Sequence, residues 1–233
     1  MSVFRFKQFD VRQDLTPMKV GTDGVLLGAW VSVEASDRRL LDVGTGTGLI
    51  ALMLAQRAPQ ARVTGIDVEP VDEACANAAA SPWAGRLQMV RMAVQEFEPQ
   101  ERFDLIVSNP PFFVDSLTCP DAGRTTARHA VRLPFAELRD AAVRLLQPGG
   151  RFAAILPADA AERFIALCDG RLFLVRRTDV RTAPRRPVKR VLLELGTSAP
   201  QAPRCSELVI GTGEHECFTP EYRALTRDFY LKF

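Results

Sequence analysis

Short apolar runs alternate along the chain with longer segments that carry apolar residues at helical spacing. Buried strands are predicted at 40–43, 61–67, 87–92, 103–108 and 151–156. Helices are predicted at 49–57, 71–80, 135–146 and 160–168, the third of them stopped by proline and glycine at 148–150. Alternation of this kind indicates right-handed βαβ units and a parallel sheet with helices on both faces.

The two ends of the chain depart from this alternation. Residues 4–11 switch between apolar and polar, which suits short extended segments, and 25–33 is predicted as a helix capped by Thr22 or Asp23. Near the other end, 172–180 and 190–195 are predicted strands joined by a short link with proline, so they pair antiparallel. We therefore expect an α/β fold in one domain over 1–233, with a mostly parallel, seven-stranded sheet that ends in an antiparallel hairpin.

Composition is that of an ordinary globular protein, with 47% hydrophobic and 25% charged residues. No apolar run approaches the roughly 18 to 20 residues that a membrane helix needs, and residues 1–5 lack the layout of a signal peptide. The five cysteines are scattered without CxxC pairs, which argues against a disulfide framework and a zinc site. We expect a cytoplasmic protein with no membrane segment, no metal and no obligate protein partner.

Basic residues concentrate in the predicted hairpin at 171–195, although the net charge of the chain is only +2. A basic stripe on a nearly neutral protein is typical of a phosphate-contacting surface. The alternative is a solvated, arginine-rich face, and we favour the first interpretation. The basic residues are Arg171, Arg176, Arg177, Arg181, Arg185, Arg186, Lys189 and Arg190.

A glycine loop follows the first predicted strand and leads into a helix. Its glycines permit a tight turn and let a ligand touch the backbone, as in nucleotide-dependent oxidoreductases. Here, however, the spacing is G-x-G-x-G, and Asp42 precedes it by two residues. S-adenosylmethionine has no pyrophosphate but carries an ammonium that such an acid can bind, and Asp67 at the end of the next strand suits ribose hydroxyls. Alternatively, Asp42 is a turn aspartate and Asp67 a solvated strand-end acid. The candidate cofactor residues are Asp42, Gly44, Gly46, Gly48, Asp67, Val68, Ala93, Val94 and Asn109.

The turn Asn109-Pro110-Pro111-Phe112 ends the fourth predicted strand, at the edge where open α/β sheets bind ligands. Two prolines remove two N–H donors and leave carbonyl acceptors. The Asn109 side-chain oxygen and the Pro110 carbonyl could each accept one hydrogen of an amine, which turns the nitrogen lone pair toward an incoming methyl group. Phe112 could stack on the ring. The turn therefore predicts methyl transfer to a planar exocyclic nitrogen through positioning and electrostatics; a proline-rich strand end is the alternative.

These motifs resemble class I methyltransferases that act on the amino group of adenine, guanine or glutamine. Segments 18–30, 80–83 and 229–233 are further similar to the bacterial tRNA1(Val) adenine-37 N6-methyltransferases, and the similarity runs from about 6 to 233. The resemblance implies a Rossmann-like fold, S-adenosylmethionine as methyl donor and an adenine N6 of tRNA as acceptor. It also implies that Thr22 and Asp23 lie against the methionine end of the cofactor, in an extension over 1–35 that packs on the cofactor side.

One position departs from the family pattern. Relatives usually carry an acid where this chain has Ala93, to accept a hydrogen bond from the cofactor's adenine amine. Gln95 or a backbone carbonyl could substitute; otherwise cofactor affinity is expected to be lower.

RNA contacts are expected at two places. Arg128 and His129 follow a loop over 115–128 that we expect to be mobile, and they match a conspicuous pair in the family; His129 is equally an ordinary loop histidine. In the hairpin, phosphate contacts are predicted for Arg185, Arg186, Lys189 and Arg190. The alternatives are a guanine N2 of ribosomal RNA, an adenine of DNA, a protein glutamine, or an RNA-binding module without catalysis.

Overall fold

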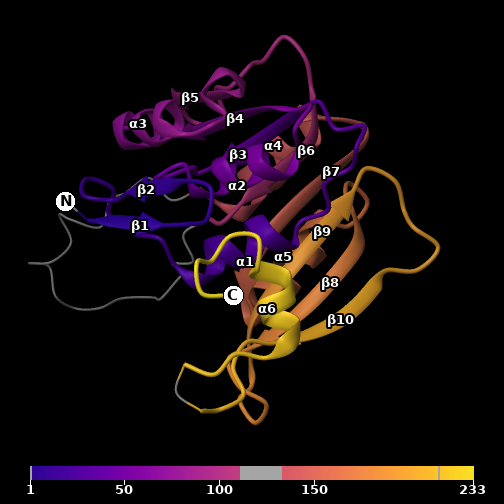
Figure 1. Cartoon of the computed structure of the whole chain (residues 1–233). Helices are drawn as coiled ribbons and strands as arrows, with labels where there is room; N and C mark the ends of the chain where they lie inside the picture. Colours follow the sequence, from indigo (N-terminus) through magenta and orange to yellow (C-terminus); the bar gives the residue numbers. More distant parts are fainter. Residues whose placement is uncertain (1, 111–132, 215) are drawn as a thin grey trace, which may run out of the picture.

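The computed structural model describes residues 2–110, 133–214 and 216–233. Within these ranges, one sheet has the strand order β10-β8-β9-β7-β6-β3-β4-β5, and β1 and β2 form a separate two-stranded ribbon. Figure 1 shows helices on both faces of the twisted main sheet. The predicted α/β architecture is confirmed.

Parallel strands, most of them connected through helices, form one side of the main sheet. The strands are β3 (Arg39–Val43), β4 (Arg62–Asp67), β5 (Leu87–Arg91), β6 (Phe103–Ser108) and β7 (Leu146–Pro157). The helices are α2 (Leu49–Arg57), α3 (Asp72–Ala80), α4 (Phe135–Leu145), α5 (Ala158–Cys168) and the 3-10 turn η1 (Ala84–Arg86). These elements agree with the predicted ones to within a few residues. The exception is β7, which begins directly after α4 because Leu146 pairs with Phe103, so the expected stop at 148–150 lies inside this strand.

The sheet is buried on both faces, which explains why its central strands read as continuous apolar runs. On one face, α4 and α5 cover β3, β6 and β7 through side chains such as Leu138 and Phe164. On the other face, α1 (Thr22–Trp30) and α2 pack on the alternate strand residues, among them Leu40 and Leu105. These two layers hold the carboxyl ends of β3, β4 and β6 in fixed positions.

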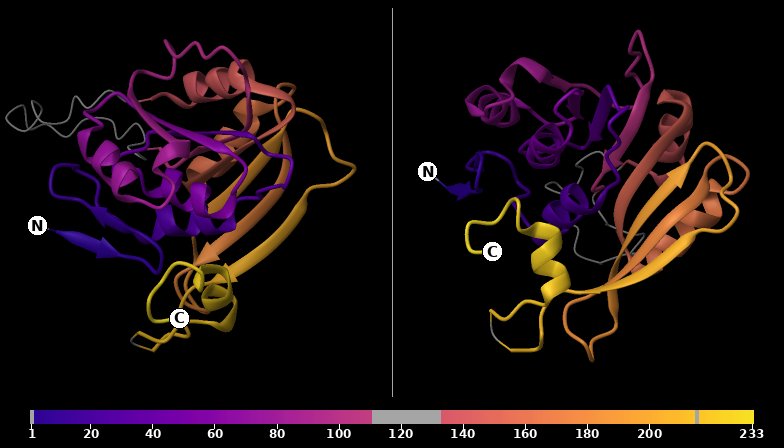
Figure 2. Two further views of the ribbon diagram at one scale, coloured as in Figure 1. Left: turned by 45° about the horizontal axis from the view of Figure 1, so that its top comes forward. Right: turned by 45° about the vertical axis from the view of Figure 1, so that its right-hand side comes forward.

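The hairpin is present as predicted, but the seven-stranded sheet is a wrong prediction. Strands β8 (Phe173–Arg181) and β9 (Val188–Gly196) pair antiparallel, and β9 also runs antiparallel to β7. An eighth strand, β10 (Arg204–Val209), then pairs parallel with β8 at the edge (Figures 1 and 2). The strand escaped prediction because four of its six residues are exposed and only Leu208 is buried, so no apolar pattern marks it.

The two ends of the chain fold together. Phe6 pairs with Tyr230 in an isolated antiparallel bridge, and the N–H of Lys7 donates to the carbonyl of Phe229 at 2.8 Å. Aromatic rings fill the contact, with Phe6 stacked on Phe9 at 4.7 Å. The terminal elements are β1 (Val3–Arg5), β2 (Asp10–Arg12) and α6 (Pro220–Thr226), and α6 lies beside α1 (Figure 2).

Candidate functional site

The glycine loop joins β3 to α2 at the carboxyl edge of the sheet. Gly44, Gly46 and Gly48 have φ angles of +75°, +52° and +83°, which residues with a side chain rarely adopt. The N–H groups of Gly44 and Thr45 both donate to the carbonyl of Ile66, at 2.9 and 3.0 Å, so the loop is anchored on β4. A Cβ on Gly48 would lie 3.4 Å from the Cβ of Ala74, which shows that α3 packs directly on this loop.

Asp42 lies beneath the loop and is fully buried. Its Oδ2 accepts hydrogen bonds from the Thr45 hydroxyl at 2.7 Å and from the Ala51 N–H at 3.2 Å. Its Oδ1 is buried and has no partner among the described residues. Burial raises the pKa of Asp42 to about 7, and the two hydrogen bonds oppose this rise. A buried carboxylate oxygen that lacks a partner fits the ammonium group of S-adenosylmethionine.

Asp67 ends β4 beside the same loop. Its Oδ2 accepts from the N–H of Gly46 at 2.9 Å, and its Oδ1 accepts from the N–H of Glu69 at 3.0 Å. Because each carboxylate oxygen has about two acceptor sites, both retain capacity for a ribose hydroxyl. The N–H of Met92 donates to the Asp67 carbonyl at 2.8 Å and thereby brings the segment after β5 to this place. The other predicted cofactor residues of this edge are Val68 and Ala93, both half-buried, and the buried Val94.

Asn109 and Pro110 follow β6, the strand next to β3. The Ser108 hydroxyl donates to the carbonyl of Val43 at 2.9 Å, so the ends of β6 and β3 are joined. The Oδ1 of Asn109 is buried and has no partner among the described residues. A second unsatisfied acceptor therefore lies one strand away from Asp42. The remaining predicted site residues, Pro111, Phe112, Arg128 and His129, lie outside the described residues, as does the loop over 115–128.

Helix α1 begins at Thr22, and its start differs from the prediction. The N-cap residue is Gly21, and no side chain caps the helix. Instead, the Asp23 carboxylate accepts a hydrogen bond from Nε of Arg190 at 2.7 Å. The predicted cap is thus wrong: the Asp23 carboxylate, which was expected to accept from N–H groups of the first turn, accepts from Arg190 of β9 instead.

The basic hairpin is largely paired within the protein. Arg177 bonds both Glu162 and Asp179, and Arg181 bonds Glu207. Arg176 lies 3.6 Å from the ring centroid of Trp30 and 3.4 Å from Glu194. The basic residues that remain exposed are Arg185 and Arg186 on the link between β8 and β9, and Lys189 at the start of β9. The link lies at the carboxyl edge, because Arg190 pairs with Pro157 at the end of β7.

Two buried polar residues of α3 were missed by the sequence analysis. Glu73 and Asn77 bind the N-terminal segment over 12–16, and Asn77 also donates to the carbonyl of Thr47 in the glycine loop at 2.9 Å. Both stand on the buried face of the helix. The sequence does carry a signal for them. On a helix face that is otherwise alanine, an acid and an amide lie four residues apart, and buried polar groups need partners.

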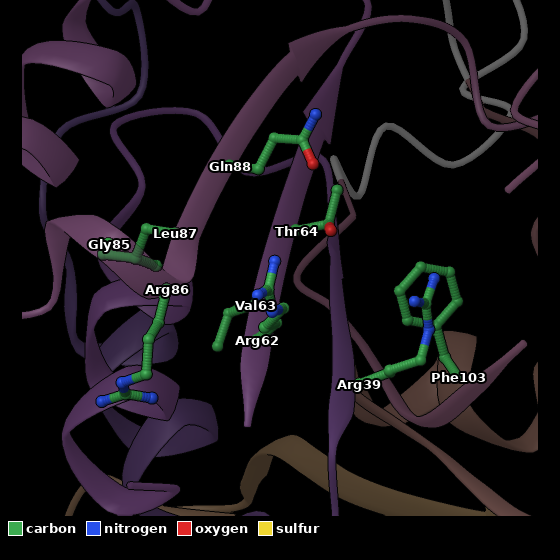
Figure 3. A pocket seen from close by; sticks show the side chains of 9 residues that line it. All are labelled: Arg39, Arg62, Val63, Thr64, Gly85, Arg86, Leu87, Gln88 and Phe103. Atoms are coloured by element: carbon green, nitrogen blue, oxygen red, sulfur yellow. The ribbon is translucent and has the colours of Figure 1, made fainter. Parts of the chain in front are cut away.

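A hollow of about 170 Å³ lies elsewhere on the sheet (Figure 3). It is bordered by the first residues of four strands, Arg39, Arg62, Leu87 and Phe103, and therefore lies at the amino edge. The glycine loop is at the opposite ends of these strands, so this hollow is not part of the candidate site.

Neither a membrane-spanning helix nor a metal-binding cluster is present in the described part of the chain. No helix there is long and apolar enough to cross a membrane. No group of three or more His, Cys, Asp or Glu side chains within 2–110, 133–214 and 216–233 is arranged to hold a metal ion.

Solved structures with the same fold are methyltransferases. A predicted O-methyltransferase, protein Atu636 from Agrobacterium tumefaciens, superposes with a TM-score of 0.68 at 21% identity, covering 89% of this chain and 96% of that one. The N-methyltransferase NodS from Bradyrhizobium japonicum WM9, in complex with S-adenosyl-L-homocysteine, gives a TM-score of 0.51 at 20% identity, covering 69% and 78%. At these identities the likeness shows a shared fold.

Comparison of the sequence with curated proteins gives relatives of much higher identity than these solved structures. The family model "Methyltransferase small domain" matches residues 23–159. The tRNA1(Val) (adenine(37)-N6)-methyltransferase of Phocaeicola vulgatus is 46% identical over 98% of this chain and 97% of its own length. The proteins of that name from Flavobacterium johnsoniae and Trichodesmium erythraeum are both 44% identical over 99% of this chain, and over 100% and 98% of their own lengths. The chain therefore belongs to the family of tRNA1(Val) (adenine(37)-N6)-methyltransferases.

Proposed function

We propose that this enzyme transfers the methyl group of S-adenosylmethionine to the exocyclic N6 of an adenine in tRNA, at position 37 of tRNA1(Val). The observation that carries the proposal is the pair of buried, unpartnered oxygens, Asp42 Oδ1 and Asn109 Oδ1, at the carboxyl ends of adjacent parallel strands. One suits the ammonium of the cofactor and the other suits an amine of the substrate. A buried acceptor without a partner costs free energy that a bound donor recovers.

The cofactor side is proposed to consist of residues at the ends of β3, β4 and β5. When bound, S-adenosylmethionine supplies a methyl group that is activated for transfer. Asp42 accepts from the ammonium group, Asp67 accepts from the ribose hydroxyls, and the glycine loop gives the ligand close access to its backbone. Proposed contacts to the remainder of the cofactor are made by Thr22, Asp23, Val68, Ala93 and Val94.

On the substrate side, Asn109 is proposed to orient the amine. Its Oδ1 accepts one N6 hydrogen and the Pro110 carbonyl accepts the other, so the nitrogen lone pair points toward the methyl group. No strong base is needed, because the new N–C bond would form as the carbon–sulfur bond of the donor breaks, and the N6 proton would leave to solvent only afterwards. The site thus contributes positioning and electrostatic stabilisation. Pro111 and Phe112 remain part of the proposal as the outer half of the turn.

The RNA backbone is proposed to lie along the link between β8 and β9. Arg185 and Arg186 are exposed there and Lys189 is exposed at the start of β9, on the edge of the sheet that carries Asn109. Arg190 is engaged by Asp23, so we assign it to positioning α1. Bases of an anticodon loop can be splayed out, which lets an adenine reach the Asn109 turn at low cost. A single domain, a cytoplasmic location and the absence of an obligate protein partner complete the proposal.

Methyl transfer to defined RNA tests this function. Labelled S-adenosylmethionine is incubated with tRNA1(Val) transcript and with a transcript that carries guanine at position 37, and the nucleosides are analysed by mass spectrometry. The expected product is N6-methyladenosine in the first RNA alone, and it disappears with the Asn109→Ala variant. Label in 2-methylguanosine, in DNA or in protein would contradict the proposal, and absence of label would favour a non-catalytic RNA-binding module.

A further inference from the structure

The N-terminal segment over 12–16 lies against the glycine loop and is joined to it by one buried amide. Asn77, which is 2% exposed, accepts from the N–H of Arg12 through Oδ1 at 2.9 Å. Its Nδ2 donates to the carbonyls of Arg12 and Thr47, both at 2.9 Å. Because Thr47 belongs to the glycine loop, this side chain links the loop to the end of β2.

Glu73, one helical turn before Asn77, binds the next part of the segment. Its carboxylate accepts the N–H of Leu15 at 3.1 Å and that of Thr16 at 2.9 Å. It also accepts the N–H of Asp14 and the Thr16 hydroxyl. Burial raises the pKa of Glu73, but these hydrogen bonds outweigh burial and hold the pKa below its ordinary value. The carboxylate is therefore charged and used by three consecutive backbone donors.

The contact continues from the segment to the cofactor residues. A Cβ placed on Gly46 would lie 3.8 Å from the Thr16 methyl group, so this threonine packs on the half-buried middle of the glycine loop. The N–H of Gly46 in turn donates to Asp67 at 2.9 Å. A continuous series of contacts thus leads from Glu73 through Thr16 and Gly46 to the proposed ribose-binding carboxylate.

Helix packing alone does not account for an acid at this position. The other apolar residues on the buried face of α3 are Ala74 and Ala78, and an alanine would satisfy packing there without the cost of burying a charge. The backbone N–H groups of 14–16, by contrast, all use this carboxylate as their acceptor.

We propose that Glu73 is a positioning residue that holds segment 14–16 against the glycine loop as the outer wall of the cofactor pocket. The inference rests on the proposed function, because it takes S-adenosylmethionine as the ligand of that pocket. Loss of the acceptor releases the segment, opens the wall and weakens cofactor binding. The Asn109 turn and the link between β8 and β9 lie on other strands and are unaffected.

Cofactor affinity tests the inference on the full chain. S-adenosylhomocysteine is titrated calorimetrically into the wild type, Glu73→Ala, Glu73→Gln and Asp72→Asn. Asp72 is the exposed acid next to Glu73 on the same helical turn, so its variant controls for charge. The dissociation constant is expected to rise about tenfold in Glu73→Ala, as for loss of one hydrogen bond to a charged group. It should rise less in Glu73→Gln, which keeps one acceptor oxygen, and stay unchanged in Asp72→Asn.

A second variant keeps the test informative should the Glu73 variants unfold. Thr16→Val removes one hydroxyl hydrogen bond on the exposed side of the contact and leaves Glu73 in place. Its KM for S-adenosylmethionine should rise while kcat at saturating cofactor and KM for tRNA stay at wild-type values. A loss of fold stability alone would lower the amount of active enzyme instead. Wild-type cofactor affinity in folded Glu73→Ala or unchanged kinetics in Thr16→Val would overturn the inference.

Limited proteolysis separates this inference from the proposed function. Arg12 and Lys19 are exposed trypsin sites on either side of segment 14–16. Cleavage at both is expected to be faster in Glu73→Gln than in Asp72→Asn, and S-adenosylhomocysteine should slow it in the wild type. Equal cleavage rates would refute the anchoring role of Glu73. If the wild type fails to bind the ligand at all, the proposed function fails while the cleavage rates still report on the anchor.

Discussion

Asp23 and Arg190 form an ion pair that joins the first turn of α1 to β9, with 2.7 Å between Asp23 Oδ2 and Arg190 Nε. Their side chains are 27% and 23% exposed, so the pair is shielded from much of the solvent. From the sequence, the acid was expected to contact the cofactor and the arginine was expected to contact RNA phosphate. The structure connects the two, so the hairpin supports the first turn of α1, the helix that we propose to contact the cofactor.

This pair predicts different effects for two neighbouring basic residues. Arg190→Ala is expected to weaken S-adenosylhomocysteine binding several-fold and to lower the free energy of unfolding by about 1 kcal/mol. The physical reason is that α1 loses the contact that fixes its first turn. Calorimetry and denaturant unfolding measure the two effects. Lys189→Ala, one residue away and exposed, is the control and should change neither. If Arg190→Ala leaves cofactor affinity intact and weakens only tRNA binding, the arginine contacts phosphate after all.

A second prediction concerns protons at Asp42, whose pKa burial raises to about 7. The ammonium of the cofactor favours the ionised carboxylate, so binding near pH 6 should release a proton. Calorimetric titrations in two buffers with different ionisation enthalpies measure this release. Asp42→Asn, which cannot titrate, should show none and bind more weakly. Binding by the wild type without proton exchange at this pH would contradict the role given to Asp42.

The raised pKa of Asp42 also predicts how the stability of the protein depends on pH. A carboxyl whose pKa rises on folding stabilises the protein most below its unfolded pKa of 3.8, and this contribution is lost as the pH rises through about 7. The cofactor-free enzyme should therefore become less stable between about pH 5 and pH 8, by an amount that Asp42→Asn removes. Thermal unfolding across this range is the measurement, and an identical pH profile in both proteins would exclude Asp42 as the cause.

Another prediction returns to Ala93, where the family resemblance leads us to expect an acid. The Gln95 amide nitrogen donates to Glu137, and its carbonyl oxygen keeps its acceptor capacity as the substitute that the sequence left open. Ala93 is half-buried beside Val94 at the cofactor edge, and a carboxylate there could accept from the adenine amine. Ala93→Asp is therefore expected to lower the cofactor dissociation constant several-fold in calorimetry. Ala93→Ser serves as a small polar control without charge. An unchanged dissociation constant in Ala93→Asp would show that the missing acid at position 93 does not lower cofactor affinity.

The sequence predicted the parts of the molecule that are set by local pattern. The strands at 40–43 and 103–108 have strong apolar runs, and the glycine spacing requires the turn that Gly44, Gly46 and Gly48 adopt. Contacts between distant segments left no such pattern. Strand β10 forms through its pairing with β8. The role of Glu73 depends on backbone N–H donors that lie 57 to 59 residues earlier in the chain.

The basic residues of the hairpin also show that contacts between distant segments cannot be read from local sequence. Its residues were taken together because they are close in sequence, yet side chains of a strand alternate between faces. Arg177 bonds Glu162 of α5, whereas Arg176 stacks on Trp30 of α1. Charge density along a chain therefore overestimates the number of cations that are free to bind RNA.

That overestimate leads to the last prediction, on the salt dependence of tRNA binding. Each phosphate contact adds roughly 0.7 to 0.9 to the slope of log affinity against log salt. Replacing Arg185, Arg186 and Lys189 by alanine should therefore weaken binding and flatten the slope by about two to three. Arg177→Ala is the matched control, because this arginine is already bonded to Glu162 and Asp179, and its loss should leave the slope unchanged. Titrations at several salt concentrations decide the matter. An unchanged slope in the triple variant would move the RNA surface away from the link between β8 and β9.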